Sequence, residues 1–139
     1  MSAIHPTDCG KIVYVVDDDG DVRESLCALL EAHGLKVEEF GSAASLLEKT
    51  RGEGADFLLF DLHMPGMSGI ELLELLRRRG VRTPAAILTG RLDRTLLPRM
   101  KLAGVTAGLQ KPVDLATLLS LFDSAGRKSG DPTAITPHT

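Results

Sequence analysis

One aspartate stands where an apolar segment in the middle of the chain ends. Residues 57–60 read Phe-Leu-Leu-Phe, Asp61 follows at once, and Pro65 and Gly66 come shortly after it. A short apolar run bounded by Pro and Gly is typical of a strand that is buried on both faces of a sheet. A carboxylate in such a place costs free energy unless it is paired or binds a metal ion. Asp61 therefore indicates chemistry rather than stability.

Polar side chains follow three other apolar runs, at the points where further strands would end. They are Asp17, Asp18, Asp19, Thr89 and Lys111. Each has an ordinary structural explanation when taken alone, such as a solvated turn, a helix cap or a surface lysine. Together they combine clustered carboxylates, which favour a hard divalent cation, with a hydroxyl and an ammonium that can hold phosphoryl oxygens. The combination predicts phosphoryl transfer, with Asp61 as a carboxylate nucleophile that forms an acyl phosphate.

The elements that must bring these residues together alternate along the chain. Five strands are predicted at residues 12–16, 37–40, 57–60, 85–88 and 105–110. Helical spacing of apolar residues follows each strand, with Ser42, Ser68 and Asp114 as predicted caps of the second, third and fifth helices. This βα alternation predicts an α/β fold, a doubly wound five-stranded parallel sheet with five helices on both faces. The carboxyl ends of its strands share one edge, where sites of such sheets lie.

Composition narrows the class of protein. The 139 residues suffice for one domain with a core, and the formal net charge of −3 does not favour direct nucleic-acid binding. No apolar stretch approaches the roughly 18 residues of a membrane span, and no signal peptide is visible.

Cys9 and Cys27 form no CxxC motif, and Cys27 is predicted to be a small core residue. Residues 77–79, three arginines, are predicted to be a solvated helix end, and a cytoplasmic location is expected.

The chain resembles the receiver domains of two-component response regulators. The matching segments are residues 16–19 (Val-Asp-Asp-Asp), 61–69 (Asp-Leu-His-Met-Pro-Gly-Met-Ser-Gly), 88–90 (Leu-Thr-Gly) and 111–112 (Lys-Pro). The resemblance implies a strand order of 2-1-3-4-5, which is the order of flavodoxin-like sheets. It also implies a signalling receiver that promotes only its own aspartyl phosphorylation and dephosphorylation. The expected partners are a histidine kinase or a phosphotransfer protein and a downstream protein, with no membrane.

Residue roles follow from the same resemblance. Asp61 matches the phospho-accepting aspartate, Thr89 the hydroxyl that turns toward the phosphoryl group, and Lys111 the lysine that pairs with it. The resemblance implies that Mg²⁺ or Mn²⁺ is the cofactor. Its implied ligands are Asp18 directly, Asp17 largely through water, Asp61, and the backbone carbonyl of His63.

Two positions depart from the family pattern. Gly108 stands three residues before Lys111, where most receivers carry the Tyr or Phe that reports phosphorylation to the partner face; a glycine there is expected to leave space beside the fifth strand. Pro98 falls in the second turn of a helix that Asp93 would cap, where it would cost about 3 kcal/mol. We therefore expect the fourth helix, near residues 96–103, to start late or to be kinked, and to be short or mobile.

Other functions are weaker matches. Asp17-x-Asp19-Gly20 resembles the nucleophile motif of haloacid dehalogenase-type phosphatases, but the later acidic pair is missing and Asp61 would have no role. An EF-hand reading fails because Val22 occupies the position that requires glycine. A receiver fold that serves as a docking module without being phosphorylated is the remaining alternative.

The predicted organisation is an N-terminal extension at residues 1–10, a receiver domain at 11–125 and a flexible C-terminal tail at 126–139. The initial Met1 and the short polar tail favour a single-domain response regulator over a receiver cut from a longer protein.

Overall fold

The elements alternate in the predicted way. The computed structural model describes residues 11–127, so the predicted N-terminal extension and residues 128–139 of the predicted tail lie outside the described residues. In chain order the elements are β1 Ile12–Val16, α1 Gly20–Ala32, β2 Lys36–Phe40, α2 Ala43–Lys49, β3 Phe57–Asp61, α3 Gly69–Arg78, β4 Ala85–Thr89, the 3₁₀ turn η1 Arg94–Leu96, α4 Leu97–Leu102, β5 Val105–Gln110 and α5 Leu115–Arg127. The last helix thus continues two residues beyond the predicted end of the domain.

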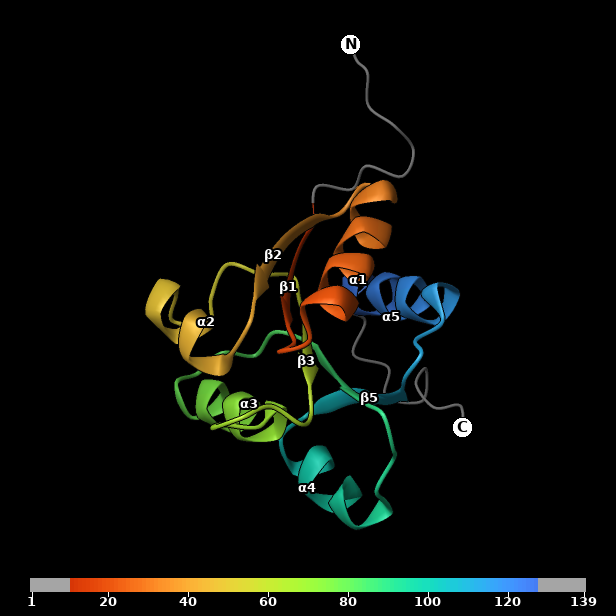
Figure 1. Ribbon diagram of the computed structural model, residues 1–139. Coiled ribbons are helices and arrows are strands. Elements are labelled where there is room, and N and C mark those ends of the chain that lie inside the picture. Colours follow the sequence, from red (N-terminus) through yellow and green to blue (C-terminus); the bar gives the residue numbers. More distant parts are fainter. Residues whose placement is uncertain (1–10, 128–139) are drawn as a thin grey trace.

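All five strands are parallel and form one sheet with the order β2-β1-β3-β4-β5, so the implied order is confirmed (Figure 1). β1 lies between β2 and β3, and the order of the strands along the chain reverses there. Val16 pairs with Phe40 on one side and Phe60 on the other, while Asp61 pairs with Leu88. The strands therefore end at nearly the same level, and the residues after them meet at one edge.

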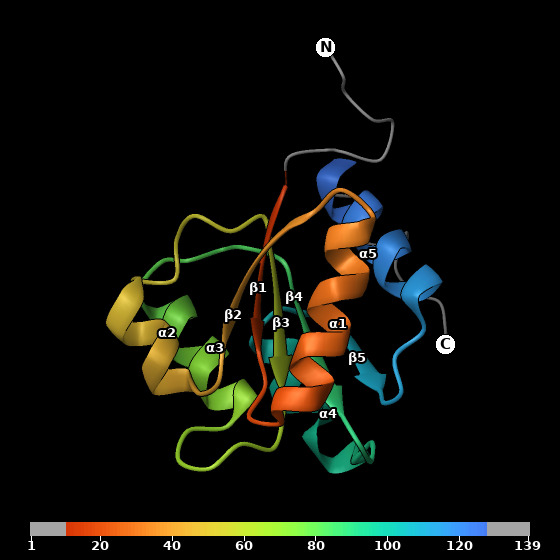
Figure 2. The ribbon, with the colours of Figure 1, turned by 45° about the horizontal axis from the view of Figure 1, so that its top comes forward.

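Helices cover both faces of the sheet, and each face has its own core (Figures 1 and 2). Alternation along β1 shows the division, since Tyr14 and Val16 point to one face and Val13 and Val15 to the other. α2, α3 and α4 pack on the first face, and α1 and α5 on the second. β3 and β4 are buried along their whole length, as predicted for strands covered on both sides.

Side-chain caps fix the first turns of α1 and α3. Asp19 accepts hydrogen bonds from the backbone N–H groups of Asp21 and Val22 at the start of α1. Ser68 accepts from the N–H of Glu71, whose carboxylate accepts in return from the N–H of Ser68, so α3 begins with a complete capping box. These caps set where α1 and α3 begin, directly after the loops that follow β1 and β3.

The fourth helix starts late, as expected from Pro98. Asp93 caps only the 3₁₀ turn η1, through the N–H of Thr95, and α4 has Pro98 in its first turn. A proline is tolerated there because that backbone N–H would have no partner inside the helix. α4 is consequently a helix of 6 residues, which confirms that it is short.

The space expected beside Gly108 is occupied. A Cβ added at Gly108 would lie 3.4 Å from the Met100 sulfur and 3.8 Å from Leu92 Cδ1. Met100, on α4, is only 3 % exposed. The expectation of open space is therefore wrong, because an unbranched thioether from the neighbouring helix fills the place that a larger residue on β5 would need.

The prediction of a solvated arginine run is wrong for Arg77. Its guanidinium is half-buried and donates to the carbonyl oxygens of Val81, Thr83 and Ala103 at 3.0, 2.7 and 2.8 Å. Burial lowers the pKa of Arg77. These bonds tie the end of α3 to the segment before β4 and to the turn after α4, whereas residues 78 and 79 are exposed as predicted.

The predicted core role of Cys27 is confirmed. The side chain is 4 % exposed among apolar neighbours, and burial raises the pKa of its thiol to about 12. Within residues 11–127, none of the helices has the length and the apolar character that crossing a bilayer requires.

Candidate functional site

Three carboxylates meet at the carboxyl edge of the sheet. Asp17 and Asp18 follow β1, Asp61 ends β3, and one oxygen of each lies within 4.8 Å of the others. Asp17 is 0 % exposed and Asp61 is 5 % exposed, whereas Asp18 is open to solvent. The structure therefore brings together the carboxylates that the sequence placed on two separate strands, because β1 and β3 are neighbours in the sheet.

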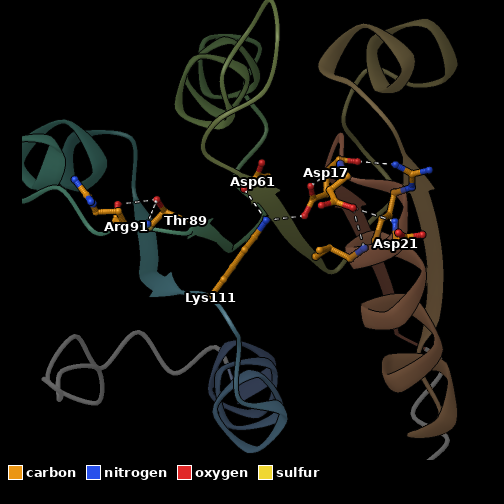
Figure 3. Close-up of polar contacts among 9 residues, drawn as sticks. Asp17, Asp21, Asp61, Thr89, Arg91 and Lys111 are labelled. Atoms are coloured by element: carbon orange, nitrogen blue, oxygen red, sulfur yellow. Dashed lines mark hydrogen bonds and ion pairs between the residues drawn. The ribbon is translucent and has the colours of Figure 1, made fainter.

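Lys111 supplies a positive charge to the two buried carboxylates. It follows β5, and its ammonium lies 3.0 Å from Asp17 Oδ2 and 3.0 Å from Asp61 Oδ1 (Figure 3). The ammonium donates to both oxygens from one side of the cluster. An ammonium shared between two buried carboxylates offsets part of the cost of burying them.

The pKa values of Asp61 and Lys111 are both raised, for different reasons. Burial raises the pKa of Asp61, with a further contribution from the neighbouring Asp17, and the hydrogen bond from Lys111 offsets only part of the effect. Burial acts in the opposite direction on Lys111, but the hydrogen bonds to Asp17 and Asp61 outweigh it, so the pKa of Lys111 is raised. Asp61 is thus a carboxylate whose negative charge is poorly compensated by the protein alone.

Hydrogen bonds to the backbone and side chain of Asp17 hold the loop after β1 in place. The N–H of Asp17 donates to the Phe40 carbonyl at 3.1 Å, and Asp17 Oδ1 accepts from the N–H of Asp19 at 3.0 Å. The Asp17 carbonyl accepts from Arg23 Nη1 at 2.6 Å. These contacts engage every polar group of Asp17 once its bond to Lys111 is counted, as burial requires.

The loop after β3 depends on a close approach at Gly69. A Cβ added at Gly69, the first residue of α3, would overlap the backbone carbonyl oxygen of Asp61 and lie 3.2 Å from the Cβ of Phe60. Only a residue without a side chain lets the start of α3 lie against the end of β3. Gly69 therefore sets the position of the backbone that carries Asp61.

Thr89 ends β4 with its hydroxyl directed along its own loop. The hydroxyl donates to the Arg91 carbonyl at 2.8 Å and accepts from the Arg91 N–H at 3.2 Å (Figure 3). The side chain is 0 % exposed. Thr89 lies at the predicted edge, but its hydroxyl is engaged with Arg91 rather than with the carboxylates.

His63 lies two residues past Asp61, with an exposed side chain. The imidazole therefore faces solvent, and the resemblance assigns only the backbone carbonyl of His63 to the cation. Pro98 and Gly108 lie apart from the carboxylates, on the first turn of α4 and on β5. They therefore bear on the surroundings of the site rather than on its chemistry.

The donor set fits a hard divalent cation. Its side-chain atoms are carboxylate oxygens, which Mg²⁺ and Mn²⁺ prefer, and one of the three carboxylates is solvent-exposed, which suits a cation that keeps several waters. The raised pKa of Asp61 indicates that more positive charge would stabilise its ionised form. Asp17, Asp18 and Asp61, with the His63 carbonyl, are the groups that could hold such an ion.

Sequence reasoning missed two residues that shape this edge. Gly69 was part of a motif, but its close approach to Asp61 is visible only once α3 and β3 are packed together. Arg23 was not singled out, although it contacts the Asp17 carbonyl. In the sequence, only one feature points to Arg23: it stands one helical turn after the acidic residues. Many solvated arginines occupy the same kind of position, so this feature did not single it out.

Known proteins resemble this chain over most of its length. A family model described as the response regulator receiver domain matches residues 13–123. The transcriptional regulatory protein FixJ of Azorhizobium caulinodans is 39% identical over 119 residues, which cover 86% of this chain and 56% of that protein. The DNA-binding transcriptional regulator NtrC of Escherichia coli K12 is 34% identical over 114 residues, 82% of this chain and 24% of that protein. The chain spans about half the length of the FixJ relatives that it matches.

Solved structures show the same fold. The crystal structure of FixJ-N has a TM-score of 0.75 and 30% sequence identity, and the match covers 84% of this chain and 94% of that one. The Vibrio cholerae chemotaxis protein CheY4 has a TM-score of 0.77 and 27% identity, and the match covers 84% of this chain and 99% of that one. The residues matched by the family model, 13–123, include the loops that carry the acidic cluster.

Proposed function

This chain belongs to the response regulator receiver domain family, and from that membership we propose that Asp61 is its phospho-accepting residue. The observation that carries the proposal is the position of Asp61, a buried carboxylate with raised pKa at the end of β3, between Asp17 and Lys111. Receivers of two-component systems act in signalling. The proposed chemistry is therefore phosphorylation of Asp61 in this chain, and not the turnover of a separate substrate. We propose residues 11–125 as the receiver domain, with α5 extending to Arg127.

In the proposed reaction, a carboxylate oxygen of Asp61 attacks the phosphorus of a phosphohistidine on a histidine kinase or phosphotransfer protein. A P–O bond to Asp61 forms as the P–N bond to the donor breaks, and the leaving imidazole recovers its electron pair and takes a proton. The product is an acyl phosphate on Asp61. Histidine kinase partners are implied by the response regulator relatives.

The side chains around Asp61 have distinct proposed roles. Asp17, Asp18, Asp61 and the His63 carbonyl would hold Mg²⁺, and the chemistry that the bound ion supplies is neutralisation of charge on the transferring phosphoryl group. Lys111 already lies 3.0 Å from Asp61 Oδ1, so its ammonium can pair with a phosphoryl oxygen without a large movement. Formation of the acyl phosphate removes the negative charge of the Asp61 carboxylate itself, so the ammonium becomes available for a phosphoryl oxygen.

Thr89 is the proposed reporter of the modification. To donate to a phosphoryl oxygen, its hydroxyl must give up the hydrogen bonds to the carbonyl and N–H of Arg91. A buried hydroxyl exchanges partners only if a new acceptor replaces the old one. Phosphorylation would therefore free the segment after β4, which leads through η1 into α4, and alter the binding of a protein partner.

The test is phosphorylation by acetyl phosphate with Mg²⁺, followed by mass spectrometry of the intact chain and of its peptides. Wild type is expected to gain one phosphoryl group on Asp61, and Asp61→Asn to gain none. Asp56→Asn is a matched control, because Asp56 is a carboxylate that bonds the Ile12 N–H away from the cluster, and this variant should be phosphorylated normally. Modification of Asp17 instead would indicate the phosphatase-type nucleophile, and no modification of wild type would indicate a docking module.

A further inference from the structure

Arg23 is a half-buried arginine on α1 that contacts the loop after β1, which carries Asp17 and Asp18. Its Nη1 donates to the Asp17 carbonyl at 2.6 Å, and its Nε donates to Glu39 Oε1 at 2.9 Å. Glu39 lies on β2, so the guanidinium joins α1, β2 and the loop after β1. One rigid, planar fork that engages two acceptors is a geometry that lysine cannot reproduce.

Two glycines flank the Arg23 guanidinium. A Cβ added at Gly41 would lie 3.5 Å from Nη1, and a Cβ added at Gly20 would lie 3.7 Å from Nη2. The side chain is 21% exposed, compared with 45% for its partner Glu39. The Arg23 side chain is therefore confined between the first residue of α1 and the residue that follows β2, rather than extended into solvent.

The contact bears directly on Asp18. The peptide group between Asp17 and Asp18 is planar, so fixing its carbonyl also fixes the direction in which the chain enters Asp18. Within residues 11–127, no side-chain hydrogen bond or ion pair holds the exposed Asp18 carboxylate, so the backbone sets its position. The other Asp17 contacts, from Lys111 and from the Asp19 N–H, bind its side chain and not this peptide carbonyl.

We propose that Arg23 is a positioning residue of the cation site, which holds the peptide between Asp17 and Asp18 so that both carboxylates face Asp61. The proposal rests on the proposed function, because it concerns the same carboxylates. Arg23 touches neither the cation nor the phosphoryl group. It acts through the loop, and Glu39 orients it.

The sign of the effect distinguishes positioning from charge. Arg23 carries a positive charge beside an acidic cluster, so charge alone predicts that its removal strengthens cation binding. Positioning predicts the opposite, because a loop that is free to rotate presents its carboxylates less often in the binding arrangement. Loss of an outer residue that orients metal ligands typically weakens affinity by about 10- to 100-fold.

The experiment measures Mg²⁺ binding to the full 139-residue chain by isothermal titration calorimetry, with no phosphoryl donor. Arg23→Gln is expected to raise the Mg²⁺ dissociation constant by roughly tenfold. Arg23→Lys keeps the charge but loses the fork, and it is expected to weaken binding by a smaller factor. Arg99→Gln is the matched control, because Arg99 forms a 2.8 Å ion pair with Glu74 away from the cluster, and its dissociation constant should equal that of wild type.

The outcomes separate this proposal from the proposed function. Unchanged or tighter Mg²⁺ binding in Arg23→Gln and Arg23→Lys, with wild type binding normally, would overturn the positioning role alone. Loss of stability toward urea with an unchanged dissociation constant would do the same, since it indicates a purely structural ion pair. Failure of wild type to bind Mg²⁺ would overturn the cation site and this inference with it. If Arg23→Gln does not fold, Arg23→Lys decides the question.

Discussion

Lys111 and Asp61 are in direct contact although the strands that lead to them are not neighbours in the sheet. Asp61 ends β3, Lys111 follows β5, and β4 lies between them in the sheet. The Lys111 side chain reaches across the end of β4 and places its ammonium 3.0 Å from Asp61 Oδ1. The same ammonium bonds Asp17 on the far side, so one lysine joins three strand ends.

Replacing Lys111 by Met should destabilise the protein by about 2 kcal/mol, because two buried carboxylates lose their cation. Added Mg²⁺ should recover part of the loss, since an ion bound only by the folded state stabilises it. Urea unfolding with and without Mg²⁺ measures both effects. Lys101→Met, which alters an exposed residue of α4, should change the free energy of unfolding by less than about 0.5 kcal/mol. Equal losses in the two variants would contradict the proposed role.

Wild type should also lose stability at alkaline pH in a way that depends on Lys111. The raised pKa of Lys111 means that its charged form is favoured in the folded state. That contribution is fully present below the ordinary lysine pKa of about 10.4 and is lost as pH rises through the folded value. The free energy of unfolding of Lys111→Met should lack this alkaline decline. A decline of the same size in both proteins would assign it to other groups.

Asp61→Asn should be more stable than wild type at neutral pH by on the order of 1 kcal/mol, as is common for charges retained at functional sites. The raised pKa of Asp61 means that the folded state binds the Asp61 proton more tightly than the unfolded chain does. Stability therefore falls as pH rises from the ordinary pKa of about 3.9 through the folded value, and the cost remains above it.

The pH dependence provides the check on Asp61. The advantage of Asp61→Asn in free energy of unfolding should shrink as pH falls and vanish below about pH 3.9. Asp56→Asn keeps an amide oxygen that can accept from the Ile12 N–H, and because Asp56 lies away from the cluster this variant should show no gain. A stability difference for Asp61→Asn that is independent of pH would contradict the electrostatic cause.

Gly69→Ala should destabilise the protein by about 3 kcal/mol, because the new methyl group overlaps the carbonyl oxygen of Asp61. Gly20→Ala is the matched control, since Gly20 is the first residue of α1 as Gly69 is of α3. A Cβ at Gly20 meets only Arg23 Nη2, at 3.7 Å, so its effect should stay within about 0.5 kcal/mol. Thermal or urea unfolding of the two variants gives the comparison, and similar values would argue against the close approach.

Gly108 and Met100 should be energetically coupled. Gly108→Phe alone should destabilise by about 1–3 kcal/mol, because the ring needs the place that Met100 fills. Met100→Ala alone should cost about 2–5 kcal/mol through the cavity that it leaves. In the double variant the ring can occupy that cavity, so the combined loss should be smaller than the sum. Additive losses in a double-mutant cycle would show that the two side chains do not share one space.

The sequence by itself determined the fold class and the chemical identity of the site. Apolar runs of strand length alternate with helical spacing, and that pattern has few solutions other than a parallel sheet covered on both faces. The late start of α4 was also predictable, because Pro98 acts through its own backbone and needs no partner. Asp61 could be singled out because a carboxylate after a buried strand is costly wherever the strand lies.

Tertiary structure decided everything that depends on contacts between distant segments. The predictions of a solvated Arg77 and of open space beside Gly108 were wrong for this reason, because Arg77 donates to a carbonyl oxygen after α4 and Met100 of α4 lies beside Gly108. The packing of the loops at the sheet edge sets three further contacts. The Thr89 hydroxyl bonds Arg91, Arg23 donates to the Asp17 carbonyl, and Lys111 is shared between Asp17 and Asp61. A one-dimensional pattern shows which residues end the strands, but only the packed sheet fixes which of their atoms meet.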